Sequence, residues 1–401
     1  MSTRPPADDT PEDPNTIESL TPEQARRLSD CFQETFLSLD RLRTLDAATA
    51  AVLAEVPVKY LSLSGLTTLA PAAARALAKT PATHLYLGVP ALDAATAGAL
   101  ADFNGEELYL LGLLSLDTDT ATALATFTGG SLVLGPFHCL MTLAPDTAGA
   151  LASSRAGFLV VGLTALDVAT ARALARFAGE GLSINGPKAL DLPLAEAVAD
   201  FRGRWLALDS VVGLDPATAN ALAAFRGEDL CLDGLRTLDT PTATALAAFG
   251  GRQLSLSGLT TPDAEAAAAI AKIAGSLYVS EELEWAFCNA NPLTVDTVAA
   301  WVALTRGNLA GITDLDSPDS IAIAQALAAR KGPLHMPDLE RISPKTLAAL
   351  IEKRDVEIPP IETLVLIPEP DGSATEEFVI PEWLAVRQKR QRSGQSAEAD
   401  S

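Results

Sequence analysis

The sequence has little positive charge and no long apolar run. It holds 29 Lys and Arg residues against 51 Asp and Glu, a formal net charge of −22. That balance works against binding nucleic acid or an anionic membrane, and it favours solubility and basic partners. No uninterrupted run of about 18 apolar residues suggests a membrane span, and the polar, acidic, proline-rich residues 1–14 do not resemble a secretory signal. We therefore expect a cytoplasmic protein that binds neither nucleic acid nor membrane.

Side chains that commonly perform catalysis or bind metals are also scarce. The three histidines are His84, His138 and His335, and they have no metal-ligand spacing. The four cysteines form no Cys-x-x-Cys pair, and Cys231 has no neighbouring histidine or basic cluster, which favours inert, reduced thiols. The sequence contains no nucleophile elbow, phosphate-binding glycine loop or HExxH motif. We expect no enzyme activity, cofactor or metal; a catalytic site built across inserted loops is a distant alternative.

One unit recurs along nearly the whole chain. In residues 230–250, apolar residues alternate with period two, a Gly-Leu turn follows, and apolar residues then recur at helical spacing. The unit predicts a short strand, a tight turn and one helix. Two weaker units follow at 307–312 and 334–339, which makes thirteen predicted strands. The first buried residue of each strong strand is expected at Leu37, Leu61, Leu85, Leu108, Leu132, Phe158, Leu182, Leu206, Leu230, Leu254 and Leu277.

Two columns of side chains have structural explanations. An aspartate precedes most predicted helices, where its carboxylate can accept hydrogen bonds from free backbone amides. We prefer this helix-capping role to a calcium ladder, because Ca²⁺ needs six to eight oxygen ligands. The aspartates are Asp46, Asp93, Asp117, Asp167, Asp191, Asp215, Asp239, Asp263 and Asp316. The phenylalanines predicted to stack in a buried column are Phe103, Phe127, Phe177, Phe201, Phe225 and Phe249.

The Leu-x-Leu strands and the repeat length of about 24 residues resemble the leucine-rich repeat family, in a divergent, bacterial-type form. The resemblance covers residues 20 to about 350. It implies a curved α/β solenoid with a parallel inner sheet and outer helices. The family's asparagine ladder is missing, since leucine occupies that position. The expected segments are a disordered start (1–16), a capping helix (17–36), regular repeats (37–280), diverged repeats (281–355), a cap of hairpin and short helix (356–386) and a disordered tail (387–401).

The strand residues that point away from the helices form the predicted inner face. An apolar patch there suggests a binding surface, although a loop or terminal segment covering it is an alternative. Insertions after the fifth and eleventh strands would line the same rim. We interpret the chain as a non-catalytic protein–protein interaction scaffold; a structural or self-associating repeat protein is the alternative. The predicted partner-binding residues are Tyr86, Tyr109, Leu111, Val133, Phe137, Leu159, Val161, Asp209, Asp233 and Trp285.

Overall fold

The computed structural model describes residues 14–31, 35–135, 142–260, 264–280, 294–305, 308–329, 332–369 and 380–385. The chain divides into two compact units. Unit 1 comprises residues 1–236, 248–258 and 273–278, and unit 2 comprises residues 237–247, 259–272 and 279–401. Among the described residues, no helix is long and apolar enough to cross a membrane.

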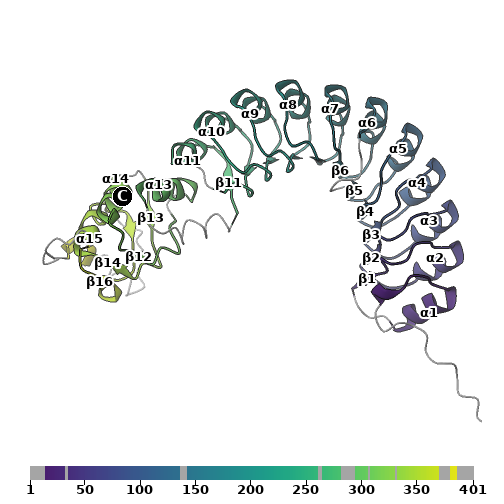
Figure 1. The fold of residues 1–401 in the computed structure, drawn as a ribbon, viewed down its shortest axis with the longest axis horizontal. Coiled ribbons are helices and arrows are strands. Elements are labelled where there is room, and N and C mark those ends of the chain that lie inside the picture. The colour runs from purple at the N-terminus through teal and green to yellow at the C-terminus, as the bar shows by residue number, and fades with distance from the viewer. Residues whose placement is uncertain are drawn as a thin grey trace, which may run out of the picture. The chain divides into compact units, whose positions relative to one another are not determined.

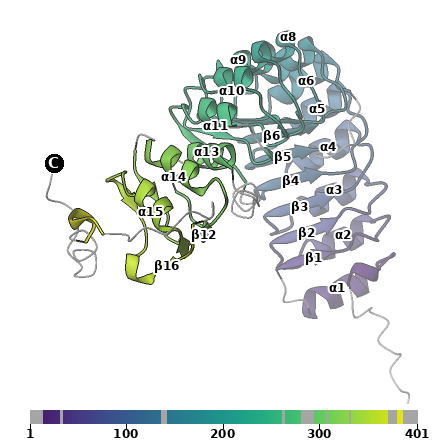
Figure 2. The same ribbon diagram turned by 60° about the vertical axis from the view of Figure 1, so that its left-hand side comes forward.

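Unit 1 is built on one parallel sheet of eleven strands that follow one another in chain order. The strands lie on the inner side of a curved stack and the helices on its outer side (Figure 1), so the predicted α/β solenoid is confirmed. Figure 2 shows the first strands side by side, each paired with the next repeat. The strands are β1 (Phe36–Ser38), β2 (Tyr60–Leu63), β3 (His84–Leu87), β4 (Glu107–Leu110), β5 (Ser131–Leu134), β6 (Phe158–Gly162), β7 (Gly181–Asn185), β8 (Trp205–Ala207), β9 (Asp229–Cys231), β10 (Gln253–Ser255) and β11 (Ser276–Tyr278).

A short helix follows each strand from β1 to β10, and most of these helices have seven or eight residues. Their many alanines lack bulk, so neighbouring helices within each unit can pack closely. In unit 1 the helices are α1 (Pro22–Cys31), α2 (Ala47–Leu53), α3 (Pro71–Leu77), α4 (Ala94–Ala101), α5 (Thr118–Leu124), α6 (Pro145–Ala152), α7 (Val168–Leu174), α8 (Leu192–Ala199) and α9 (Pro216–Ala223), with a 3₁₀ turn η1 (Pro14–Thr16) before α1. In unit 2 they are α10 (Thr240–Leu246), α11 (Ala264–Ile270), α13 (Val295–Leu304), α14 (Ser320–Ala329) and α15 (Pro344–Leu350), with a 3₁₀ turn η2 (Ile361–Thr363).

The register confirms ten of the eleven predicted first strand residues and corrects one. Leu132 pairs with Leu159, so Phe158 is not the buried residue of β6. Leu159 and Val161 are completely buried, whereas Val160 points to the inner face. A slip of one residue exchanges the two faces of a strand. Phe158 was misleading because it places a large apolar side chain one position before a run of three more.

The predicted phenylalanine column is present and interrupted once. Phe201 stacks on Phe225 with ring centroids 6.2 Å apart, and every ring of the column is at most 3% exposed. The ring of Phe201 lies over Gly203, where a Cβ would come within 2.2 Å of it, so glycine is needed there. In the sixth repeat the equivalent residue is Ser154, whose amide makes the same bond to the helix as that of Phe127. The column is therefore two stacks, one of Phe103 and Phe127 and one running from Phe177 to Phe249.

The aspartates before the helices are N-caps, as predicted. Asp117 Oδ1 accepts from the Thr120 amide at 2.7 Å, and the bond lowers the pKa of the Asp117 carboxyl. Equivalent bonds are made by Asp46, Asp93, Asp167, Asp191, Asp215 and Asp239. Asp263 lies outside the described residues. The prediction for Asp316 is wrong, because α14 begins only at Ser320.

A column of buried threonines contacts the preceding repeat at four positions. Thr170 Oγ1 donates to the Leu143 carbonyl at 3.1 Å, one repeat earlier. The Thr96 and Thr120 hydroxyls lie 3.4 and 3.5 Å from the Leu69 and Leu92 carbonyls. The Thr49 hydroxyl, which donates to Asp46 at 2.9 Å, lies 3.4 Å from the Leu20 carbonyl. Thr170 and Leu143 are both buried, so their bond satisfies polar groups that would be costly to leave unpaired. These bonds link successive turns in a chain that lacks an asparagine ladder.

In unit 2 the described strands form two small parallel sheets, one ordered β12-β14-β16 and the other β13-β15. The predicted strand at 307–312 appears as a single bridge between Asn308 and His335, and the strand at 334–339 appears as β13. Residues 365–366 of the predicted hairpin pair in parallel with β14, while its turn and most of its second strand lie outside the described residues. Residues 382–385 are helical. The strands are β12 (Asp314–Leu315), β13 (Leu334–His335), β14 (Arg341–Ile342), β15 (Val356–Glu357) and β16 (Val365–Leu366).

Candidate functional site: the inner face of unit 1

The inner face of unit 1 presents three columns of side chains, since alternate strand residues point away from the helices. The first column holds the residue immediately before the first leucine of each strand. The second lies between the two buried residues, and the third follows the second buried residue. The first column runs Phe36, Tyr60, His84, Glu107, Ser131, Phe158, Gly181, Trp205, Asp229, Gln253 and Ser276. The second runs Ser38, Ser62, Tyr86, Tyr109, Val133, Val160, Ser183, Ala207, Cys231, Ser255 and Tyr278.

Aromatic rings begin the first column. Phe36 is 49% exposed and lies 6.3 Å from Tyr60, whose ring centroid is 4.4 Å from that of His84. Lys59 places its ammonium 5.3 Å from the Tyr60 ring centroid, which is a cation–π distance. The Nδ1 of His84 is 2.7 Å from the Thr83 hydroxyl, which orients the imidazole. Three successive strands therefore present a run of rings.

Two tyrosines stack in the second column and connect to the first. The ring of Tyr86 lies 4.3 Å from that of Tyr109, with the planes 15° apart. The Tyr109 hydroxyl donates to Glu107, whose Oε2 is also 3.5 Å from His84 Nε2. All four of these side chains are half-buried. The tyrosine cluster, as we call it, consists of Phe36, Tyr60, His84, Tyr86, Glu107 and Tyr109.

Burial and the Glu107 carboxylate both act on the phenols of Tyr86 and Tyr109. Burial raises the pKa of Tyr109 well above its usual value, and the hydrogen bond and charge of Glu107 raise it further. Burial is also the main cause that raises the pKa of Tyr86, with a contribution from the Glu107 charge. Both phenols are therefore neutral at physiological pH.

A second aromatic pair lies farther along the first column. Phe158 and Trp205 meet edge to face with centroids 5.9 Å apart, although β7 separates their strands. They meet over Gly181, where a Cβ would lie 2.3 Å from Phe158 and 2.8 Å from Trp205. Glycine is thus required at this position by the two rings.

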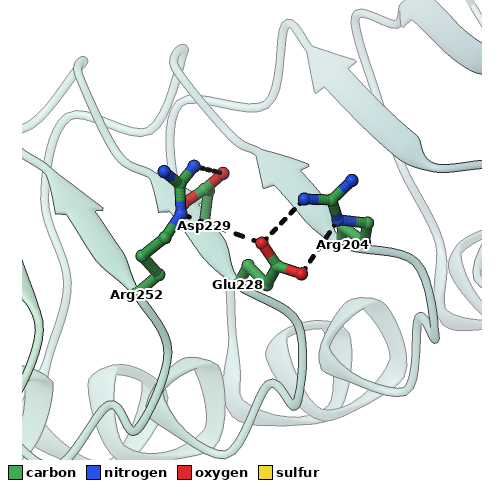
Figure 3. Close-up of polar contacts among 4 residues, drawn as sticks. All are labelled: Arg204, Glu228, Asp229 and Arg252. Carbon is green, nitrogen blue, oxygen red and sulfur yellow. Dashed lines mark hydrogen bonds and ion pairs between the residues drawn. The ribbon is translucent and has the colours of Figure 1, made fainter.

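A ladder of charges borders the first column from β8 to β10 (Figure 3). Arg204 makes a bidentate contact with Glu228, both bonds being 2.9 Å, and Arg252 reaches Asp229 at 2.7 Å. Arg252 also lies 3.7 Å from Glu228, so the four charges alternate. The bond from Arg204 lowers the pKa of Glu228. Both arginines are more than 60% exposed, and exposed pairs contribute little stability.

The two predicted acidic residues of the third column have internal bonds. Asp209 Oδ1 accepts from the Asp233 amide at 3.2 Å. Asp233 Oδ1 accepts from the Ser255 hydroxyl at 2.6 Å and the Ser257 amide at 2.8 Å. Asp40 repeats this pattern with the corresponding serines of β2. Burial raises the pKa of Asp209, and the nearby Asp233 charge raises it further. These carboxylates link adjacent turns of the inner face.

Some of the predicted binding residues lie together on the inner face, and others are buried in the core. Tyr86, Tyr109 and Leu111 lie on neighbouring strands or turns and remain partly exposed, whereas Val133 is only 5% exposed. Leu159 and Val161 belong to the core, so their assignment to the inner face is wrong, and Val160 takes that place. Phe137 and Trp285 lie outside the described residues.

Sequence reasoning missed the whole first column, including Tyr60, His84, Glu107 and Trp205. The signal was present, because each of these residues immediately precedes the first strand leucine. The Leu-x-Leu pattern starts at the leucine, so it predicts only the inner-face positions that follow that leucine. A strand that extends one residue farther toward its N-terminus exposes a third position on the same face.

The described residues offer no group of three His, Cys, Asp or Glu side chains close enough to hold a metal ion. Cys231, on the second column, is half-buried, and burial raises the pKa of its thiol to about 12. Its thiol is therefore protonated at neutral pH and a poor nucleophile, which agrees with its interpretation as an inert cysteine.

No protein-family model and no curated protein matches the chain. Among solved structures, two of the Toll–Spatzle complex of Drosophila resemble it, both at 12% sequence identity. The glycosylated form aligns with 62% of this chain and 43% of that chain, at a TM-score of 0.28. The other aligns with 82% of this chain and 55% of that chain, at a TM-score of 0.32. The chain thus spans about half the length of these structures, and a likeness this low says nothing about function.

Proposed function

We propose that the protein is a non-catalytic scaffold of the leucine-rich repeat type that binds a protein partner on the inner face of unit 1. The observation that carries this proposal is the tyrosine cluster. Large aromatic side chains are expensive to leave in water, and rigid tyrosines are enriched where proteins recognise one another. Here the tyrosines lie on the sheet face opposite the helices, on adjacent strands.

The spacing of the aromatic groups supports a protein rather than a small molecule as the partner. The tyrosine cluster spans β1 to β4, and the Phe158–Trp205 pair spans β6 to β8. Adjacent strands are about 4.8 Å apart, so the two groups together extend over about 30 Å. An extended surface of this size suits a protein segment.

Affinity capture from native lysate tests this proposal. The bait is the full chain, compared with the double variant Tyr86→Ala/Tyr109→Ala and with Leu192→Ser, which removes an apolar side chain that is 40% exposed at the start of an outer helix. We expect a retained protein to be lost only from the inner-face variant. Equal retention by all three baits would contradict an inner-face site. If the molar mass of the purified chain doubles as its concentration rises, and the Tyr86→Ala/Tyr109→Ala variant stays monomeric, the inner face instead mediates self-association.

A further inference from the structure

The tyrosine cluster has the chemistry of a site for a cationic side chain. Its rings offer π faces, which attract ammonium and guanidinium groups, and Glu107 adds a carboxylate between the two columns. The ammonium of Lys59 already occupies a cation–π position over Tyr60.

Arginine matches this surface better than lysine does. A guanidinium is planar, it stacks on tyrosine rings, and its N–H groups can contact a carboxylate at the same time. Tyr86 and Tyr109 are nearly parallel, and Glu107 lies beside them in the next column. A guanidinium placed on the Tyr86–Tyr109 stack would have the carboxylate of Glu107 beside it. That carboxylate contributes to the raised pKa of both tyrosines, and burial contributes more.

The charge of the whole chain acts in the same direction. A net charge of −22 attracts positively charged partners over the range of the Debye length, about 8 Å at physiological salt. The rings and Glu107 would then provide short-range contacts that depend on geometry. We infer that the tyrosine cluster binds an arginine side chain presented by a basic segment of a partner protein. This inference rests on the proposed function and specifies the partner's chemistry.

Fluorescence anisotropy with defined peptides tests the inference. The probes are labelled peptides of alternating arginine and serine, lysine and serine, and glutamate and serine, titrated with the full chain at about 0.15 M salt. We expect the arginine peptide to bind most tightly, the lysine peptide more weakly and the glutamate peptide not at all. Absence of arginine-peptide binding, or equal binding of the arginine and lysine peptides, would overturn the inference.

Matched variants distinguish binding by the tyrosine cluster from general attraction to the negative charge of the chain. Glu107→Gln and Glu106→Gln remove the same charge from adjacent residues, but only Glu107 contacts Tyr109 and His84. Tyr86→Ala and Tyr278→Ala remove the same side chain from the same column, and Tyr278 is 52% exposed at the far end of the sheet. We expect Glu107→Gln and Tyr86→Ala to weaken arginine-peptide binding about tenfold, with the other two within twofold of wild type.

Equal weakening within either matched pair would overturn the inference, because binding would then not depend on the tyrosine cluster. Tyr109→Phe is a conservative control that keeps the ring and should keep most of the affinity. Circular dichroism and thermal melting establish that each variant is folded. The same variants used in lysate capture distinguish the two proposals. A partner lost with Tyr86→Ala while arginine peptides fail to bind defeats only this inference, whereas a partner retained by Tyr86→Ala defeats the proposed function.

Discussion

Tyr86 and Tyr109 stack on adjacent strands, with ring centroids 4.3 Å apart, at equivalent positions of two successive repeats. The in-register parallel sheet produces this contact, because it places equivalent residues beside one another. The same geometry stacks Phe201 on Phe225 in the core. In a repeat protein, the same residue type at the same position of successive repeats therefore forms a continuous column. The core column stabilises the stack, whereas Tyr86 and Tyr109 remain half-buried on the inner face.

Loss of a core phenylalanine should be costly. We expect Phe201→Ala to lower the free energy of unfolding by about 3–5 kcal/mol, because it leaves a cavity between two stacked rings. Denaturant unfolding followed by circular dichroism measures the change. Phe36→Ala removes the same side chain from a position that is 49% exposed and should cost much less. Equal costs for the two variants would contradict the described packing.

The threonine ladder should contribute measurably to coupling between repeats. Thr170→Val keeps the shape but removes the hydroxyl bonded to Leu143, and we expect a loss of about 1 kcal/mol from one buried hydrogen bond. Thr122→Val is the control, since that hydroxyl is exposed and donates within its own helix. Chemical denaturation of both variants gives the difference. A loss no larger for Thr170→Val than for Thr122→Val would show that the ladder does not couple the repeats.

Gly181 should tolerate no side chain. The Cβ of Gly181→Ala would displace Phe158 or Trp205, and we expect a loss of about 1–3 kcal/mol together with altered tryptophan fluorescence. Gly213→Ala is the matched control, because nothing lies within 4 Å of the added Cβ. The fluorescence change should vanish when Trp205→Phe is added. An unchanged emission spectrum in Gly181→Ala would argue against the Phe158–Trp205 pair.

The N-caps predict the direction of acid destabilisation. Backbone amide bonds lower the pKa values of Asp93, Asp117 and Asp215 below the ordinary 3.8. Their contribution is fully present above the pKa of the unfolded chain, and it is lost as pH falls through the lower folded values. We expect urea stability to decline as pH falls below about 4. Replacing the three aspartates by asparagine keeps a side-chain acceptor and removes the titration, so the decline should be shallower; an identical decline would contradict this.

The sequence was sufficient to predict the repeat, the register of ten strands and the capping aspartates, because each depends on residues close in the chain. The slip at Phe158 arose where four apolar residues in a row remove the alternation that defines a strand face. The threonine ladder was missed for a different reason. Its acceptor is a backbone carbonyl one repeat away, and a carbonyl has no signature in the sequence.

The candidate site was predicted only in part. Tyr86 and Tyr109 were recognised because they lie between two strand leucines, while His84 and Glu107 precede the leucine and were overlooked. Asp209 and Asp233 were expected to face a partner, but their carboxylates accept hydrogen bonds from the next turn. The strand pattern places an acidic residue on the inner face. Its hydrogen bonds depend on groups in the next turn, which the pattern does not locate.

Photo-crosslinking most directly tests the claim that the inner face of unit 1 binds a protein. A photoreactive amino acid that keeps an aromatic ring is placed at Tyr86 and, in a parallel preparation, at Leu192 on the helical side. It is activated in native lysate, and the adducts are identified by mass spectrometry. The account predicts a specific protein adduct from position 86, lost when Glu107→Gln is added, and none from position 192. The same adducts from both positions, or adducts from position 192 alone, would contradict it.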